Sequence, residues 1–202
     1  MNDKALFKLS YGLYLLTAKD NDKLNGCIVN TVVQVANSPT RVSIAVNKQN
    51  LTHDMILATG KCAVTALSVS TPFDLFKHFG FQSGRDVDKF ANFPHSLTEE
   101  GLPYLTDNAC AYLVCHVTQT MDLGSHTLFI AEVVDADILS QEDALTYDYY
   151  HKNIKPAPAK TEAKKTGWRC TICGYIHEDE NLPADFICPL CKHGAADFEK
   201  IQ

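Results

Sequence analysis

Four cysteines near the end of the chain are the residues whose type and spacing most clearly indicate chemistry. The stretch WRCTICGYIHEDENLPADFICPLCKHG, residues 168–194, holds two Cys-x-x-Cys pairs separated by 14 residues. Thiolates are soft ligands, and four of them around one ion form a tetrahedral site for zinc or for iron. A tight turn at each pair lets backbone N–H groups point at the sulfurs and stabilise their charge. The spacing predicts a metal site, with zinc and iron both open at this point, at Cys170, Cys173, Cys188 and Cys191.

The residues around these cysteines resemble the rubredoxin family over residues 167–200. CTICGYI matches the first cysteine turn of that family, and CPLC, followed by Gly194, matches the second. Such domains shield their iron with a small aromatic core. The residues that resemble this core are Trp168, Tyr175, Phe186 and Phe198.

Two features depart from the rubredoxin pattern. The loop between the cysteine pairs is short, and in this it resembles the rubredoxin domain fused to rubrerythrin. Lys192 stands where the family has glycine, which would cost about 1 kcal/mol if the backbone there has a positive φ. The resemblance implies one iron in the four-cysteine site, which changes by one electron and has no open ligand position. Such a centre is an electron relay, and the alternative is a structural zinc ribbon, zinc also being able to replace the iron.

A second stretch with chemical potential joins a strand to a helix at residues 47–53. The first N–H groups of a helix and its dipole attract anions, and Lys, Asn, Thr and His side chains add further donors. The stretch therefore predicts a phosphate-binding turn, although many ordinary surface loops before helices have a similar composition. The candidate phosphate contacts are Asn47, Lys48, Asn50, Thr52 and His53.

With its neighbours, this turn resembles the flavin reductase-like FMN-binding split barrel. The resemblance covers about residues 1–153, and Ala131, where glycine is common, is a small departure. It implies a barrel that binds FMN at a homodimer interface. The segments that carry the likeness are residues 8–56, FKHFGFQSGRDVDKF at 76–90, GSHTLFIAEV at 124–133 and LTYDYYHK at 145–152.

The same resemblance assigns candidate roles to individual residues. Val29, Asn30 and Thr31 are expected along the isoalloxazine edge, and the five residues of the phosphate turn are expected to hold the ribityl phosphate. Lys89 is a further candidate for the phosphate. His126 is the candidate catalytic residue beside the flavin ring, where it would steady charge or orient a nicotinamide, and a purely structural role is the alternative.

The elements that must position these residues are mostly strands. YGLYLLTAK alternates and runs into the turn-forming DNDKLNG, while GCIVNTVVQVA, RVSIAV and CAVTALSV are rich in strand formers. Residues 109–139 predict a long hairpin that turns at 122–125. NLTHDMILATG predicts a helix with Thr52 as its cap and Gly60 at its end, and TPFDLFKHFG a second, from Thr71 to Gly80. Two short helices among six or more strands predict a mainly β, closed or nearly closed barrel.

A break in the pattern divides the chain. The stretch KPAPAKTEAKKT has no apolar periodicity and reads as a tether. The predicted organisation is a flavin reductase-like domain at 1–154, a linker at 155–166 and a rubredoxin-like domain at 167–202. The 202 residues, 46% of them hydrophobic, suffice for one ordinary core and a small second unit, and the net charge of −6 argues against nucleic acid.

The remaining features concern the compartment of the protein. Its apolar runs are too short to cross a bilayer, and its beginning has no apolar signal region. Four further cysteines lie scattered in apolar contexts, as expected for small buried residues in a reducing compartment. A cytoplasmic protein is therefore expected. These four are Cys27, Cys62, Cys110 and Cys115.

The two halves together resemble the high molecular weight rubredoxins. That resemblance implies an NAD(P)H-dependent reductase that passes electrons from FMN to the rubredoxin iron and on to a protein acceptor. A flavodiiron oxygen or nitric oxide reductase is the implied partner. Two alternatives stay open at this point: a free flavin or ferric reductase with a structural metal site, and an electron-transfer adaptor that cannot oxidise NADH.

Overall fold

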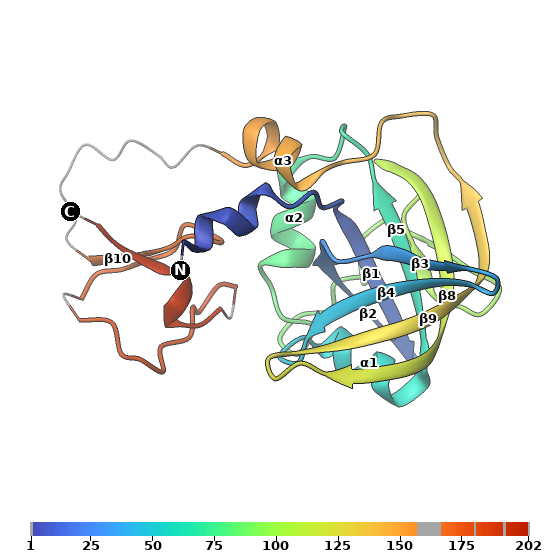
Figure 1. Ribbon diagram of the computed structural model, residues 1–202, viewed down its shortest axis with the longest axis horizontal. Helices are drawn as coiled ribbons and strands as arrows, with labels where there is room; N and C mark the ends of the chain where they lie inside the picture. Colours follow the sequence, from blue (N-terminus) through green and yellow to red (C-terminus); the bar gives the residue numbers. More distant parts are fainter. Residues whose placement is uncertain (1, 157–166, 180, 192, 202) are drawn as a thin grey trace.

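The computed structural model describes residues 2–156, 167–179, 181–191 and 193–201. In the described chain, the larger part is one seven-stranded antiparallel sheet in the order β2-β1-β5-β8-β9-β4-β3, which curls into a barrel (Figure 1). The prediction of a mainly β split barrel is confirmed. Its strands are β1 (Tyr14–Asp20), β2 (Lys23–Val29), β3 (Val33–Asn37), β4 (Thr40–Asn47), β5 (Lys61–Leu67), β8 (Ala109–Asp122) and β9 (His126–Ile138).

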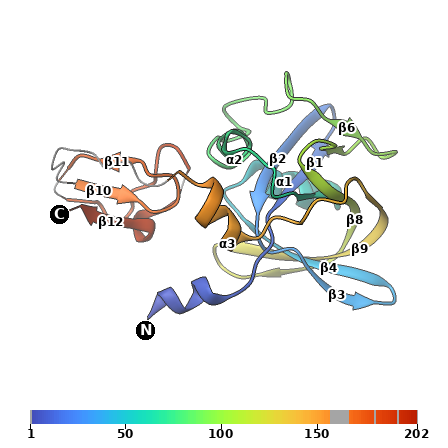
Figure 2. The same ribbon diagram turned by 90° about the horizontal axis from the view of Figure 1, so that it is seen from above.

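A second, smaller sheet lies at the C-terminal end of the chain, to one side of the barrel (Figure 2). It has the order β11-β10-β12, with β10 at Gly167–Cys170, β11 at Ile176–His177 and β12 at Phe198–Ile201. Most of the predicted linker, and Lys192 with its predicted backbone penalty, lie outside the described residues. The remaining short elements are η1 (Asp3–Lys8), β6 (Ser96–Leu97), β7 (Pro103–Tyr104), α3 (Tyr147–Tyr149), η2 (Tyr150–Ile154) and η3 (Ala195–Asp197).

The turns of the barrel match the sequence in one hairpin and differ in another. β8 and β9 form the predicted long hairpin around residues 122–125. The turn predicted over DNDKLNG is much tighter, because Asp20 pairs with Lys23 and only two residues separate β1 from β2. Asn21 takes the left-handed conformation with φ 52°, which asparagine tolerates, so the chain turns at the start of this run and not at its end, where Asn25 and Gly26 stand. Asn25 is thereby placed inside β2.

Both predicted helices are present, with different caps. α1 (Leu51–Thr59) is capped by Asn50 and not by Thr52, and it ends at Gly60 with φ 69°, as predicted. α2 (Phe73–Gly80) begins after Pro72. The Thr71 hydroxyl donates instead to the carbonyl of Ser68, 2.7 Å away, so the predicted cap is wrong. Short polar side chains choose among several nearby backbone partners, and the sequence does not show which one is in reach.

The two largest apolar clusters in the described part of the barrel lie on opposite faces of the sheet. One fills its interior, with Ile44, Ile56 and Phe129 almost fully buried. The other packs the inner face of α2, through Phe76 and Phe79, against the outside of the sheet. In the described chain, no helix is long and apolar enough to cross a membrane.

Candidate functional site

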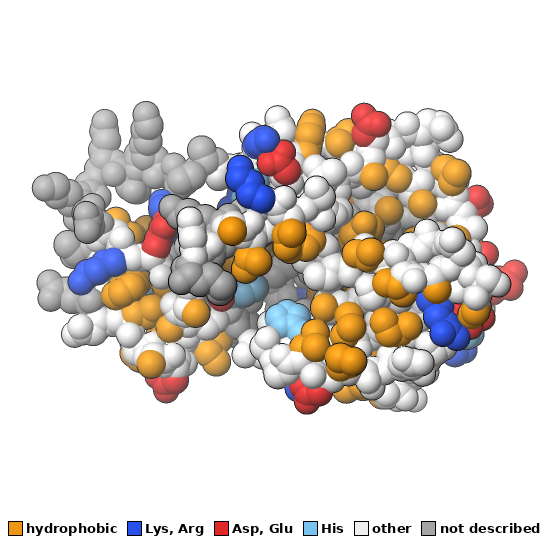
Figure 3. All heavy atoms as spheres, in the orientation of Figure 1, with side chains coloured by type: hydrophobic (Ala, Val, Ile, Leu, Met, Phe, Trp, Pro, Cys, Tyr) orange, Lys and Arg blue, Asp and Glu red, His pale blue; other side chains and the backbone are white. Residues whose placement is uncertain are grey.

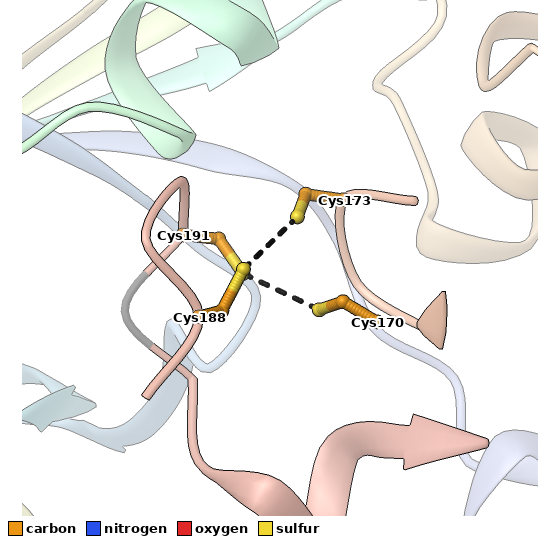
Figure 4. A group of neighbouring side chains, drawn as sticks. All are labelled: Cys170, Cys173, Cys188 and Cys191. Carbon is orange, nitrogen blue, oxygen red and sulfur yellow. Dashed lines mark hydrogen bonds between the residues drawn. The ribbon is translucent and has the colours of Figure 1, made fainter. Parts of the chain in front are cut away.

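The four predicted cysteine ligands meet at one point (Figure 4). Their sulfurs all lie within 4.8 Å of one another, with 3.5 Å between the sulfurs of Cys170 and Cys191 and between those of Cys173 and Cys188. The first pair follows β10 and turns through Gly174, whose φ of 81° suits glycine. Four thiols this close to one another form a tetrahedral ligand set for one ion.

The surroundings of the thiols favour a bound cation. The neighbouring Cys170 sulfur, above all, raises the pKa of the Cys191 thiol, because several thiolates cannot crowd together without a positive charge. A hydrogen bond from the backbone N–H of His193 lowers the same pKa, and the N–H of Tyr175 acts similarly on Cys173. The predicted turn in which N–H groups point at the sulfurs is therefore present.

The aromatic residues predicted to shield the metal do pack against the cysteine ligands. Phe198 is buried with the cysteines, and Trp168, Tyr175 and Phe186 are half-buried against them. Phe186 meets Phe198 edge to face, with 5.3 Å between ring centroids. Phe81 of the barrel packs against the same cluster, which the sequence did not indicate.

A cavity of about 210 Å³ opens in the barrel beside β2, the end of β4 and the start of α1. Its wall also includes the loop that follows α2, of which Gln82, Ser83 and Gly84 are part. Most of the predicted cofactor residues converge here from distant parts of the chain. Those that line the cavity are Val29, Asn30, Thr31, Asn47, Asn50, Thr52, Lys89 and His126.

The start of α1 forms one wall of the cavity. Asn50, Leu51 and Thr52 line it, and the Asn50 side chain makes no capping hydrogen bond to the described helix. The Asn50 side chain contacts the Cys27 thiol instead of capping its helix, so it lies in the cavity wall next to the first N–H groups of the helix. The cavity end at α1 therefore suits an anionic group.

Asn25 is a wall residue that the sequence did not reveal. It is 2% exposed, and its Nδ2 donates to the hydroxyl of Thr52 at 2.9 Å. Its Oδ1 has no hydrogen-bond partner among the described residues. A side chain on Gly84 would collide with this amide, since its Cβ would lie 2.1 Å from Oδ1. A ligand hydroxyl would satisfy the amide oxygen. The sequence analysis missed Asn25 because it placed this residue in a turn, whereas a buried asparagine within a strand would have indicated a binding residue.

Lys89 lies in the cavity wall with an unusual environment. Its ammonium donates to the carbonyls of Gly26 at 2.9 Å and Phe79 at 2.8 Å. Burial lowers the pKa of Lys89 to about 8, because desolvation disfavours the charged form. An anion bound in the cavity would stabilise the charged ammonium form of Lys89.

Two predicted phosphate contacts lie outside the cavity lining. Lys48 pairs with Asp122 on the surface, with 2.6 Å between Nζ and Oδ1. His53 is buried, and its ring nitrogens lie 2.9 Å from the Asp54 carboxylate and from the Thr127 hydroxyl. Both are thus engaged with the protein, although neighbours of each in sequence reach the cavity.

His126 lines the cavity from the first position of β9, paired in register with Asn47. Its Nδ1 lies 2.9 Å from the hydroxyl of Ser125. Burial, followed by the charges of His193 and His53, lowers the pKa of His126. The ring is therefore held in its neutral form more strongly than an exposed histidine.

The metal centre closes the other side of this cavity. Leu190, Cys191 and His193, all from the second cysteine turn, line it together with the barrel residues. Figure 3 shows histidine side chains in the hollow between the two bodies. A metal ligand therefore stands in the wall of the cavity in which the sequence predicted a flavin.

The residues present fit both expected cofactors. The α1 start, Asn50 and Lys89 suit the phosphate of FMN, and the unsatisfied oxygen of Asn25 suits a hydroxyl of its ribityl chain. The four-thiolate set with aromatic cover suits one iron.

The comparisons with known proteins agree with this division. Residues 6–157 match the family model of the flavin reductase like domain, and residues 168–199 match that of the rubrerythrin, rubredoxin-like domain. A high molecular weight rubredoxin of Moorella thermoacetica is 40% identical over an alignment of 229 residues that covers all of both chains. A ferric-chelate reductase (NAD(P)H) of Archaeoglobus fulgidus is 36% identical over 80% of this chain and 95% of its own.

Solved structures give the same fold for the barrel. The NADH:FAD oxidoreductase SgcE6 of Streptomyces globisporus superposes with a TM-score of 0.63 at 25% identity, over 72% of this chain and 89% of its own. The flavin reductase PheA2 gives 0.61 at 27% identity, over 72% and 93%. With the matches above, FMN is the cofactor of the barrel and iron that of the four-cysteine centre. The chain belongs to the flavin reductase-like oxidoreductases and, through its C-terminal rubredoxin-like unit, to the family of the high molecular weight rubredoxins.

Proposed function

We propose that this chain is an NAD(P)H-dependent reductase that passes electrons from FMN to the rubredoxin iron and on to a protein acceptor. The observation that carries the proposal is the position of Cys191, which is an iron ligand and also part of the flavin cavity wall. FMN, when bound, takes a hydride and releases electrons singly, whereas the iron accepts one at a time. A shared wall leaves a short path between the two.

The residues of the cavity have separate roles in this proposal. Val29, Asn30 and Thr31 hold the ring edge, and the α1 start holds the phosphate. His126 stands beside the ring as the candidate catalytic residue, where a neutral imidazole can donate a hydrogen bond to a bound nicotinamide. The family arrangement, a homodimer that holds FMN at its interface, is part of the proposal.

The names of two relatives support the proposed electron donor and the proposed class of electron acceptor. The Archaeoglobus relative is named for NAD(P)H, which supports a nicotinamide donor. A putative diflavin flavoprotein of Nostoc is 32% identical over 74% of this chain but only 26% of its own length. A similar barrel is thus part of a larger flavoprotein there, which supports a redox protein as the partner here. A flavodiiron oxygen or nitric oxide reductase is the partner that we propose. The domain limits 1–154, 155–166 and 167–202, and a cytoplasmic location, complete the proposal.

Rapid anaerobic mixing with NADH tests the proposed route. We expect the flavin absorbance to bleach first and the ferric-thiolate absorbance to follow within the same protein. Loss of the flavin band with a persistently oxidised iron would show that internal transfer does not occur. The rate of iron reduction should be independent of protein concentration, because the transfer takes place within one assembly.

The Archaeoglobus relative also favours a second candidate, a ferric reductase whose metal site is structural. Under that alternative, loss of the iron in a Cys188→Ser variant would leave electron delivery to protein acceptors unchanged. The third possibility is an electron-transfer adaptor that cannot oxidise NADH. It predicts no NADH consumption with any acceptor.

The low pKa of Lys89 predicts a pH-dependent affinity for FMN. The ammonium form attracts phosphate and is complete only below the pKa of about 8. We therefore expect FMN affinity to fall on the order of tenfold between about pH 7 and about pH 9.5, as Lys89 loses its proton. Quenching of flavin fluorescence on titration with apoprotein measures this affinity. Riboflavin, which lacks the phosphate, and the Lys89→Met variant should both show a flat profile, and a falling profile for riboflavin would place the effect elsewhere.

A further inference from the structure

Lys155 joins the barrel to the rubredoxin-like unit of residues 167–201, called the iron unit below, through a specific contact. It follows the last turn of η2, and its backbone N–H donates to the carbonyl of Tyr150 at 2.8 Å, which fixes its main chain to the barrel. Its ammonium reaches across and donates to the carbonyl of Thr171 at 2.9 Å. Thr171 lies between the two ligands of the first cysteine turn. A residue expected to be part of a tether is therefore an anchor.

The surroundings of Lys155 place a positive charge beside the thiolates. It is half-buried in the wall of a second cavity, between Tyr150 and His151 of the barrel and Thr171 of the iron unit. Burial lowers the pKa of Lys155, while the charges of Cys170, Cys173 and Cys191 act in the opposite direction. Arg169 is the other cation that acts on Lys155, and its side chain is engaged by Glu199 with 3.0 Å between Nε and Oε1. The Lys155 ammonium therefore lies at the first cysteine turn, where the charges of the thiolates act on it.

The charge of the cluster depends on the oxidation state of its iron. Four thiolates around ferric iron leave one net negative charge, and around ferrous iron they leave two. A fixed cation attracts the doubly negative ferrous form more strongly than the singly negative ferric form. This difference is larger in a partly dry interface than in water, because the effective dielectric constant is lower there. Reduction of the iron therefore strengthens the contact that Lys155 makes.

We propose that Lys155 is a positioning residue that couples docking of residues 167–201 on the barrel to the oxidation state of the iron. The proposal rests on the proposed function, in which the iron takes one electron from the flavin of the same protein and no atoms are transferred. By reciprocity, the factor by which reduction tightens docking is the factor by which docking favours reduction. A tenfold factor corresponds to about 59 mV in a one-electron potential.

The coupling gives the iron a different reduction potential when the iron unit is docked on the barrel and when it is undocked. When it is docked, with the second cysteine turn over the flavin cavity, the iron is the better electron acceptor. When it leaves the barrel, the influence of Lys155 is lost, the potential falls and the iron becomes the better donor to an outside protein. The direction of electron flow is thus assisted by the movement itself.

The reduction potential of the iron tests the proposal directly. Spectroelectrochemical titration of the FMN- and iron-containing protein with redox dyes should place the Lys155→Met variant lower by about 59 mV, equivalent to a tenfold loss. Lys155→Arg keeps the charge and should keep most of the potential. Lys152→Met, which removes an exposed lysine paired with Asp148, is the matched control and should leave the potential unchanged. Salt should lower the wild-type potential and have little effect on that of Lys155→Met.

Docking itself can be followed with redox-inert ions. The chain has one tryptophan, Trp168 in the iron unit, so energy transfer from it to bound FMN reports docking. Zinc(II) in the four-cysteine site carries the ferrous charge and gallium(III) the ferric charge. We expect docking to be about tenfold tighter in the zinc form than in the gallium form, and equal in Lys155→Met.

The outcomes separate this proposal from the proposed function. An unchanged potential in Lys155→Met, or equal docking of the zinc and gallium forms of the wild-type protein, would overturn the coupling even if NADH reduces the iron. Neither experiment uses NADH or an acceptor protein. The expected shifts together with an iron that NADH cannot reduce would instead refute the proposed function and leave the coupling in place.

Discussion

Replacement of Cys188 by serine should remove the iron and unfold residues 167–201, while the barrel keeps its fold and its FMN. Among the described residues of this unit, the buried apolar side chains are those of Cys170, Cys188, Cys191 and Phe198. Three of the four are metal ligands, so the unit has almost no core of its own. Small units of this size depend on a metal, and apparent metal-binding energies of about 10–16 kcal/mol are folding energy in such cases.

Iron content, the ferric-thiolate absorbance and the near-ultraviolet circular dichroism of Trp168 should all be lost in this variant. NADH oxidation with free flavin as acceptor should continue, and delivery to a protein acceptor should fall to background. Cys110→Ser is the matched control, because this thiol lies in the barrel and its contact with the carbonyl of Glu142 at 3.3 Å can be kept by a hydroxyl. A Cys188→Ser protein that keeps a folded, iron-containing unit would contradict the prediction.

Replacement of Asn50 by alanine should weaken FMN binding by about 10- to 100-fold with little change in thermal stability. A hydrogen bond to a charged group contributes about 1.5–3 kcal/mol, and the Asn50 amide stands at the cavity end that suits the phosphate. The helix should lose little, since this side chain makes no capping hydrogen bond. Isothermal titration of the apoprotein with FMN measures the affinity, and calorimetric melting of the apoprotein measures the stability.

A true cap provides the matched control for Asn50. The Thr146 hydroxyl accepts a hydrogen bond from the backbone N–H of Tyr149 at 3.1 Å, away from the flavin cavity. Thr146→Ala should therefore lower the melting temperature, by the loss of about 1 kcal/mol, and leave FMN affinity unchanged. If Asn50→Ala shows the same pattern as Thr146→Ala, Asn50 is a structural residue and the phosphate lies elsewhere.

The corrections to the predicted elements share one physical cause. Asn25 and Gly26 look like turn residues, yet they lie within β2 because Asn21 takes the left-handed turn conformation and the register of β1 with β2 follows from it. Thr52 looks like a cap, yet its hydroxyl accepts a hydrogen bond from Asn25 across the cavity wall. In both cases several local conformations were satisfactory, and a partner distant in sequence decided between them.

The sequence by itself determined the ligand set of the metal centre, the barrel class and most of the cavity residues. Cysteine spacing is a local property, because two ligands in each turn are positioned by a few residues of backbone. Alternation along the strands is local too, and it specifies which face is buried. The phosphate turn was recognised because a helix start and its donors are adjacent in the chain.

Only the tertiary structure decided how these parts meet. It separated Lys48 and His53 from the cavity, and it placed Cys191 and His193 in a wall made mainly by residues more than 60 positions earlier in the chain. It also turned Lys155 from a tether residue into a contact with the first cysteine turn. Packing between units depends on the shape and charge of whole surfaces, which no short stretch encodes, and the path from flavin to iron is therefore a property of the folded molecule alone.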